Sequence, residues 1–100
     1  MEKVEVVFTG HATGEIKLFS DEVQAGKMDI AIVKGRLTVY HTEVNPEFEG
    51  KGFAKLLLDR LVSYAKEKKL QIVPLCPYVS AQFNRHPDLY DEVWSKDWHE

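Results

Sequence analysis

Two glycines that flank a lysine, Gly50 and Gly52, lie between a strand-like run ending at Val44 and a helical pattern starting at Phe53. Glycine allows a tight backbone turn and lets several N–H groups point in one direction. The N-terminus of the following helix adds a partial positive charge at the same place. Residues 49–54 therefore predict a cradle for an anion such as a phosphate group.

Two common kinds of phosphate-binding loop are excluded by the spacing of these residues. A Walker loop requires Gly-Lys followed by Ser or Thr, and here Lys51 is followed by Gly52. A dinucleotide-binding loop requires a third glycine and an acidic residue after a second strand, and this segment has neither. The loop therefore belongs to another kind of anion site.

Two side chains suited to proton transfer, His41 and Glu43, lie in the strand-like run before the loop. Regular alternation would place both on the interior face that carries Leu37 and Val39. Burial without a hydrogen-bond partner costs roughly 2–7 kcal/mol for each polar group. We therefore expect a β-bulge within residues 40–43, which would turn both side chains into a cleft.

The composition limits the class of protein. The 100 residues, 44% hydrophobic and 29% charged, predict one globular domain spanning residues 1–100. A formal net charge of −3 argues against a nucleic-acid partner, and the single cysteine, Cys76, fits a reducing compartment. We find no signal peptide and no apolar run of the ~18 residues that a membrane span needs, so we expect a cytoplasmic protein without a membrane partner.

Alternation of apolar and polar residues predicts four strands in the first half of the chain, at residues 3–8, 15–19, 28–32 and 37–44. Lys34 and Gly35 suit a tight hairpin turn between the last two strands. The first half is therefore expected to form an antiparallel meander.

The second half changes to helical spacing. An apolar stripe predicts a helix that ends near Lys69, and its members are Phe53, Leu57, Leu61 and Ala65. Residues 70–76 predict a fifth strand, which a crossover would place parallel to the fourth. Residues 79–85 and 89–98 predict short helices, the second with Leu89 and Val93 inward. The fold class is α/β: a mixed, mostly antiparallel five-stranded sheet with a main helix after strand four and short C-terminal helices.

Pro74 and Pro77 are unusual in a central strand, because proline donates no backbone hydrogen bond. The difficulty disappears if the fifth strand moves away from the fourth. We therefore expect these two strands to part near Val44 and Pro74.

Four ordered motifs carry a resemblance to a known family: His41-Thr42-Glu43-Val44, Gly50-Lys51-Gly52-Phe53-Ala54, Cys76-Pro77-Tyr78-Val79 and His86-Pro87. With these motifs the chain resembles the GNAT superfamily of N-acetyltransferases, and more narrowly its short, single-domain branch. The resemblance implies acetyl-CoA or coenzyme A as the cofactor and an amine as the acceptor.

The resemblance also implies where the cofactor binds. Acetyl-CoA would enter a V-shaped cleft between strands four and five, with its pantetheine arm on the backbone of Glu43 and Val44. The backbone amides of the loop would receive the pyrophosphate, and the residues concerned are Gly50, Lys51, Gly52, Phe53 and Ala54. Lys51 or Lys55 would add positive charge.

Three residues are candidates for catalysis. His41 or Glu43 would help to deprotonate the acceptor amine, although either residue has the alternative role of stabilising the bulge by a hydrogen bond. Cys76 would lie near the thioester, as an acetyl acceptor or beside the leaving thiolate, with a small buried hydrophobe as the alternative. We favour direct attack of the amine, because no base adjoins Cys76 in the sequence.

The chain departs from the superfamily pattern at several places. Glu49 replaces the Arg or Gln that usually starts the loop, and Phe83 falls near the position of a proton-donating Tyr. Only residues 11–14 separate the first two strands, so the helices that build an acceptor pocket are missing. A non-catalytic CoA-binding or regulatory module is therefore the competing interpretation. His86 is expected to close a helix, and the spacing of His and Cys predicts no metal site.

Overall fold

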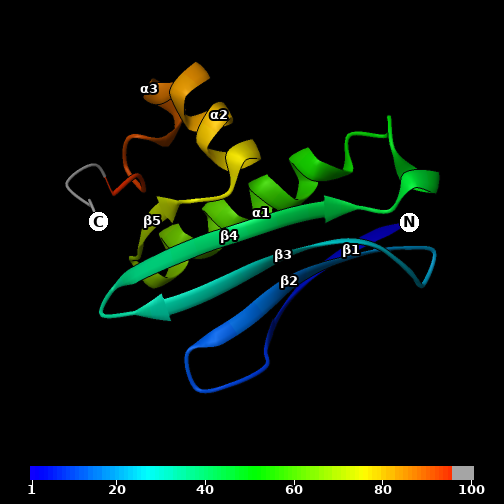
Figure 1. Ribbon diagram of the computed structural model, residues 1–100, viewed down its shortest axis with the longest axis horizontal. Helices are drawn as coiled ribbons and strands as arrows, with labels where there is room; N and C mark the ends of the chain where they lie inside the picture. Colours follow the sequence, from blue (N-terminus) through cyan, green and yellow to red (C-terminus); the bar gives the residue numbers. More distant parts are fainter. Residues whose placement is uncertain (96–100) are drawn as a thin grey trace.

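The computed structural model describes residues 1–95 as a five-stranded sheet with helices packed against it (Figure 1). The elements follow one another as β1 (Glu2–Phe8), β2 (Thr13–Ser20), β3 (Val23–Val33), β4 (Arg36–Val44), η1 (Pro46–Phe48), α1 (Phe53–Lys68), β5 (Gln71–Pro74), α2 (Pro77–Arg85) and α3 (Pro87–Tyr90). The strands lie in chain order, with β1 to β4 antiparallel and β5 parallel to β4. This arrangement confirms the predicted fold class.

Helix α1 covers one face of the sheet and forms the core with it (Figure 1). Its apolar stripe buries Phe53, Leu57, Leu61 and Ala65, as its helical spacing predicts. The strands supply the other half of the core, for example Ile16 and Leu18 of β2, which are fully buried. The opposite face of β1, β2 and β3 carries charged side chains, and within residues 1–95 no helix crosses it.

The turn between β3 and β4 has the expected hairpin geometry. Lys34 and Gly35 both take positive φ values, 51° and 79°. A two-residue turn of this hand matches the twist of the strands that it joins. The antiparallel meander of the first half is therefore confirmed.

The prediction for the last helix is wrong over the residues that the structure describes. Helix α3 ends at Tyr90, and Leu89 is 64% exposed. The chain then lies along β5, where Ile72 donates its N–H to the Val93 carbonyl at 2.6 Å and accepts a bond from Ser95 at 2.9 Å. The free edge of β5 needs such partners, and this need overrides the helical spacing. Residues 96–98 of the predicted helix lie outside the described residues.

Several element boundaries also differ from the prediction, the most at β3, which begins at Val23 and not at residue 28. Strand β5 ends at Pro74 and does not reach Cys76, while α2 begins at Pro77, two residues earlier than expected. Proline suits the first turn of a helix, because the N–H that it lacks would have no partner there. Among the described residues, no helix has the length and apolar character to cross a membrane.

Lys69 ends α1 in a left-handed conformation, with φ 57° and ψ 47°. Glycine adopts this conformation without the steric cost that a side chain imposes. We predict that Lys69→Gly raises the free energy of unfolding by about 0.5–1 kcal/mol, measured by urea denaturation. Lys66→Gly is the control: this position lies within the helix, so the same change should lower stability by about 0.5–1 kcal/mol. A Lys69→Gly variant that is less stable than the natural protein would contradict the prediction.

Candidate functional site

Strands β4 and β5 pair over only part of their length. Their parallel ladder ends at the pair Val39 and Pro74, and the last backbone bond between them runs from the Cys76 N–H to the Val39 carbonyl at 2.9 Å. Strand β4 continues to Val44, while the chain after β5 turns away into α2 (Figure 1). The predicted parting is confirmed at Pro74, but on β4 it begins at residue 40 and not near Val44. Within residues 1–95 no strand pairs with residues 40–44 on that side.

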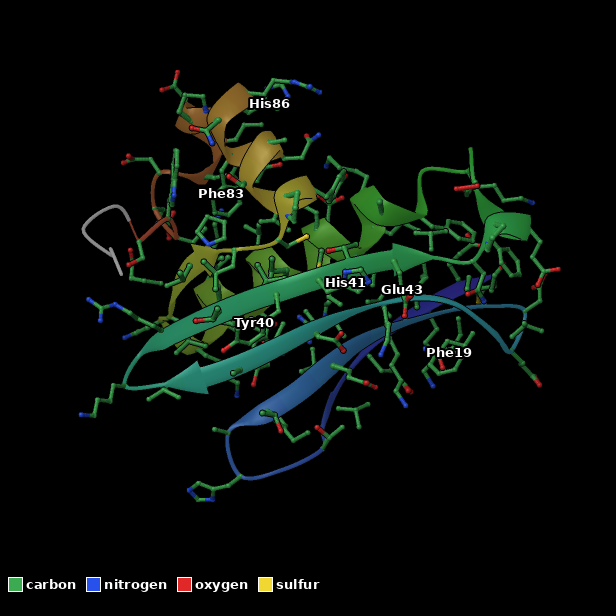
Figure 2. The ribbon with its side chains drawn as sticks, viewed as in Figure 1. Phe19, Tyr40, His41, Glu43, Phe83 and His86 are labelled. Carbon is green, nitrogen blue, oxygen red and sulfur yellow. The ribbon has the colours of Figure 1, made fainter. Side chains whose placement is uncertain are left out.

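A β-bulge in β4 lies at the start of this unpaired segment. Val39 is opposite Ile30 and His41 is opposite Asp29, so Tyr40 is an extra residue without a partner on β3. The bulge confirms the expected removal of His41 and Glu43 from the core, whereas their expected direction into a cleft stays a prediction. Both side chains are more than half exposed and lie on the open face, not in the core (Figure 2).

The reversal of faces turns Thr42 inward. Its Oγ1 lies 3.1 Å from the Sγ of Cys76, which joins β4 to the segment before α2 at the point where the strands part. Cys76 is 2% exposed, so its thiol is a buried group with a neutral hydroxyl partner. A hydroxyl does not stabilise a thiolate as a neighbouring cation would.

Strand β3 supports the unpaired segment of β4 from its other side. Gly26 is opposite Val44, and a Cβ on this glycine would lie 2.7 Å from the Glu43 carbonyl oxygen. Asn45 then donates its backbone N–H to the Ala25 carbonyl at 2.7 Å. The close approach that glycine allows fixes the backbone of Glu43 and Val44, the segment predicted to bind pantetheine.

The loop before α1 has the geometry of an anion cradle. Gly50 and Gly52 take φ values of 84° and 77°, and no side chain caps the first turn of the helix. The first N–H groups of a helix have no intrahelical acceptor, so those of Phe53, Ala54 and Lys55 are available to a ligand. Phe53 also stacks on Phe48 of η1, with ring centroids 5.8 Å apart, which ties the two ends of the loop together.

The two lysines expected near the cradle differ in their surroundings. Lys51 is exposed within the loop. Lys55 pairs with Asp59 one turn along α1, at 2.6 Å, and this carboxylate raises the pKa of Lys55. Lys55 would have to leave Asp59 to meet a phosphate, so Lys51 is the cation better placed for that contact.

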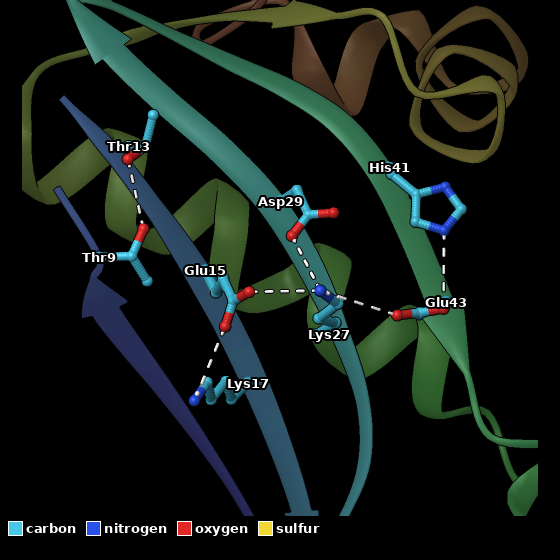
Figure 3. A network of polar contacts seen from close by, with 8 residues as sticks. All are labelled: Thr9, Thr13, Glu15, Lys17, Lys27, Asp29, His41 and Glu43. Carbon is cyan, nitrogen blue, oxygen red and sulfur yellow. Dashed lines mark hydrogen bonds and ion pairs between the residues drawn. The ribbon is translucent and has the colours of Figure 1, made fainter.

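The open face beside His41 and Glu43 holds a cluster of charged side chains from three strands (Figure 3). The His41 Nε2 lies 3.8 Å from the Glu43 Oε2. The Glu43 Oε1 lies 3.9 Å from the Nζ of Lys27 on β3. Lys27 could not be assigned from the sequence, because only the pairing of β3 with β4 brings it to Glu43. The available signal was the alternation of the inward-facing Met28 and Ile30, which leaves Lys27 on the outward face.

Tyr78 is a second residue without a predicted role. It lies in the first turn of α2, two residues after Cys76, and packs against the core. Burial raises the pKa of Tyr78, although the Lys55 ammonium opposes this shift. Its phenol therefore keeps its proton at neutral pH.

Phe83 and His86, two further residues of interest in the sequence, have structural roles. Phe83 is fully buried and stacks on Tyr90 with ring centroids 4.6 Å apart, so it belongs to the core. His86 lies exposed at the end of α2, away from His41 (Figure 2). Its backbone N–H donates to the Gln82 carbonyl at 3.0 Å. The described residues contain no group of three or more His, Cys, Asp or Glu side chains arranged to hold a metal ion.

A parted pair of parallel strands beside an uncapped helix N-terminus is the candidate site for a long ligand that carries phosphate. The chain belongs to the GCN5-related N-acetyltransferase family, whose model matches residues 15–93. Acetyl-CoA, the acetyl donor of this family, is accordingly the cofactor. A comparison of the sequence with curated proteins found no match.

Solved structures of acetyltransferases share the fold. The ribosomal-protein-S18-alanine N-acetyltransferase from Escherichia coli has a TM-score of 0.72 and 13% identity, over 89% of this chain and 76% of its own. The ribosomal-protein-alanine N-acetyltransferase from Brucella melitensis biovar Abortus 2308 has a TM-score of 0.71 and 17% identity, over 100% of this chain and 96% of its own. The PaiA N-acetyltransferase from Thermoplasma acidophilum, solved with coenzyme A, has a TM-score of 0.60 and 18% identity, over 78% of this chain and 50% of its own.

We predict that Gly52→Glu lowers the affinity for coenzyme A at least about tenfold, the equivalent of ~1.4 kcal/mol. A carboxylate at the start of α1 would occupy the first-turn N–H groups and repel phosphate. Isothermal titration calorimetry at two salt concentrations measures the effect, and binding to the natural protein should weaken as salt rises.

Gly35→Glu is the matched control, because Gly35 also has a positive φ, 79°, and also has open space around a Cβ. It imposes the same backbone strain in the turn between β3 and β4, at the opposite end of β4 from the loop, and should retain affinity. Unchanged affinity for coenzyme A in a folded Gly52→Glu variant would show that the loop does not bind the cofactor.

Proposed function

We propose that residues 1–100 form a single N-acetyltransferase domain that transfers an acetyl group from acetyl-CoA to a primary amine in the cytoplasm. One observation carries the proposal: the bulge at Tyr40 starts the unpaired edge of β4 and, by the same shift, turns His41 to the open face. In this proposal the cofactor edge and the proton acceptor share one short segment.

Each part of the segment has a role in this proposal. The amides at the start of α1 bind the pyrophosphate, and the backbone of Glu43 and Val44 orients the pantetheine arm. The bound cofactor supplies an activated thioester carbonyl. His41 or Glu43 takes a proton from the acceptor ammonium, which makes the amine nucleophilic. Holding the two reactants in this geometry supplies much of the rate enhancement.

A non-catalytic CoA-binding module is the second candidate. A short loop joins β1 to β2 directly, so the helices that form an acceptor pocket in larger relatives have no counterpart there. Phe83 in the core also offers no proton to a leaving thiolate. Both observations favour a protein that binds the cofactor and transfers nothing.

The release of free CoA with a panel of acceptors separates these candidates. The panel contains small amines, lysine peptides and peptides that start with alanine, since two structural neighbours act on the alanine of a ribosomal protein. The Gly52→Glu variant controls for contaminating enzymes. Amine-dependent CoA release that is lost in this variant supports the transferase, whereas CoA binding without amine-dependent release supports the module.

Cys76→Ser distinguishes direct attack from transfer through a cysteine thioester. The buried thiol with its Thr42 partner favours direct attack, so we predict unchanged CoA affinity and a rate lowered by less than about tenfold. Cys76→Ala should behave similarly, apart from a small loss of packing. Removal of a covalent nucleophile would instead lower the rate by several orders of magnitude. Mass spectrometry after mixing with acetyl-CoA alone gives the second readout, and an acetyl adduct on Cys76 that proceeds to product would contradict direct attack.

A further inference from the structure

Lys27 on β3 lies at the centre of the charged cluster on the open face (Figure 3). Its Nζ lies 3.2 Å from the Asp29 Oδ1, 3.3 Å from the Glu15 Oε2 and 3.9 Å from the Glu43 Oε1. Carboxylates from β2, β3 and β4 thus converge on one ammonium. Its side chain is 27% exposed, so solvent screens these contacts only in part.

The register of β3 and β4 connects this cluster to His41. Lys27 is directly opposite Glu43, and Asp29 is directly opposite His41. The imidazole therefore has one carboxylate on its own strand, at 3.8 Å, and another as its cross-strand neighbour. A carboxylate beside an imidazole stabilises the imidazolium, which cannot accept a further proton.

Lys27 opposes this effect. The Asp29 and Glu15 carboxylates raise the pKa of Lys27, so its ammonium is permanent at neutral pH. A fixed positive charge between Asp29 and Glu43 offsets part of their negative charge, so these carboxylates stabilise a cation on His41 less than they would without Lys27. The charged groups that face His41 are thus Lys27 and Asp29 from β3 and Glu43 from β4, while Glu15 and Lys17 lie one strand further away on β2.

We propose that Lys27 is a positioning residue of the acceptor face, which holds the Glu43 and Asp29 carboxylates and so limits how far they stabilise a proton on the His41 imidazole. The proposal rests on the proposed function and assigns His41 in preference to Glu43 as the proton acceptor. The acceptor ammonium gives one proton to the imidazole, leaving a neutral amine and an imidazolium. The imidazolium then loses that proton to solvent, to which the His41 side chain is 58% exposed.

Lys17 provides a matched control within the same face. It is directly opposite Lys27 on β2, and its side chain is 30% exposed against 27% for Lys27. Its ion pair is with Glu15 of its own strand, at 3.7 Å, one strand further from His41. Removing either lysine changes the net charge equally, so a difference between the two variants would come from the position of Lys27 beside Glu43 and Asp29.

The test uses the full chain and three variants, Lys27→Met, Lys27→Arg and Lys17→Met. Proton NMR follows the titration of His41, assigned by comparison with His41→Gln, and kcat/KM is measured against pH with acetyl-CoA and an active amine. In Lys27→Met we expect the midpoint of the His41 titration to move to higher pH by roughly half a unit. The acidic limb of the kcat/KM profile should move to higher pH by the same amount, which is about a threefold loss of rate below the midpoint. The loss should disappear at higher pH. Lys27→Arg and Lys17→Met should keep the natural midpoint.

Three outcomes would overturn the proposal, and a fourth separates it from the proposed function. It is overturned by an unchanged His41 midpoint in folded Lys27→Met, or by an equal shift in Lys17→Met. It is also overturned if transfer occurs and the pH profile of Lys27→Met coincides with that of the natural protein, a result that leaves the proposed function intact. If no amine is acetylated while the His41 midpoint moves as expected, the electrostatic role of Lys27 is supported and the proposed function fails.

Discussion

The single extra residue at Tyr40 is the constraint on which the candidate site depends. Without it, His41 and Glu43 would share the interior face with the core residues of β4, while Thr42 would point away from Cys76. The bulge reverses these directions at once. It also bends and twists the strand locally, and the ladder to β5 ends at the residue before it. One local irregularity therefore exposes the polar pair, buries the contact between Thr42 and Cys76 and leaves an edge free.

The free edge of β4 is held in place from one side, by its pairing with β3. Gly26 lets the backbone of β4 approach β3 closely, and the Asn45 N–H continues this pairing past the end of the strand. On the other side, Pro74 has no N–H to donate, so β5 loses little by leaving. A ligand with an extended polar arm can then pair with β4 as a further strand would. The uncapped start of α1 follows nine residues after Val44, and in the proposed site it would meet the charged end of the same ligand.

Local physics made much of this fold predictable from the sequence. Alternation specified the meander, helical spacing specified α1, and the cost of burying His41 predicted the bulge. The end of the chain was not predictable in this way. The spacing of Leu89 and Val93 suits a helix, but the requirement of the β5 edge for backbone partners decides the outcome. Lys27 was missed for a related reason: its contact with Glu43 depends on the register between strands, which no single-strand pattern contains.

The open face combines two electrostatic patterns that meet at Lys27. Across β2 and β3, like charges are directly opposite, Lys17 with Lys27 and Glu15 with Asp29, an arrangement that is unfavourable by itself. The diagonal contact between Lys27 and Glu15 offsets it. Across β3 and β4, unlike charges are directly opposite, as in Lys27 with Glu43. Because charges of both signs alternate, the face projects only a weak net field into solvent, and a cationic amine gains little long-range attraction from it. In the proposed reaction, selectivity for the acceptor would then arise from contacts within a few residues of the imidazole, where we propose that Lys27 also influences the proton.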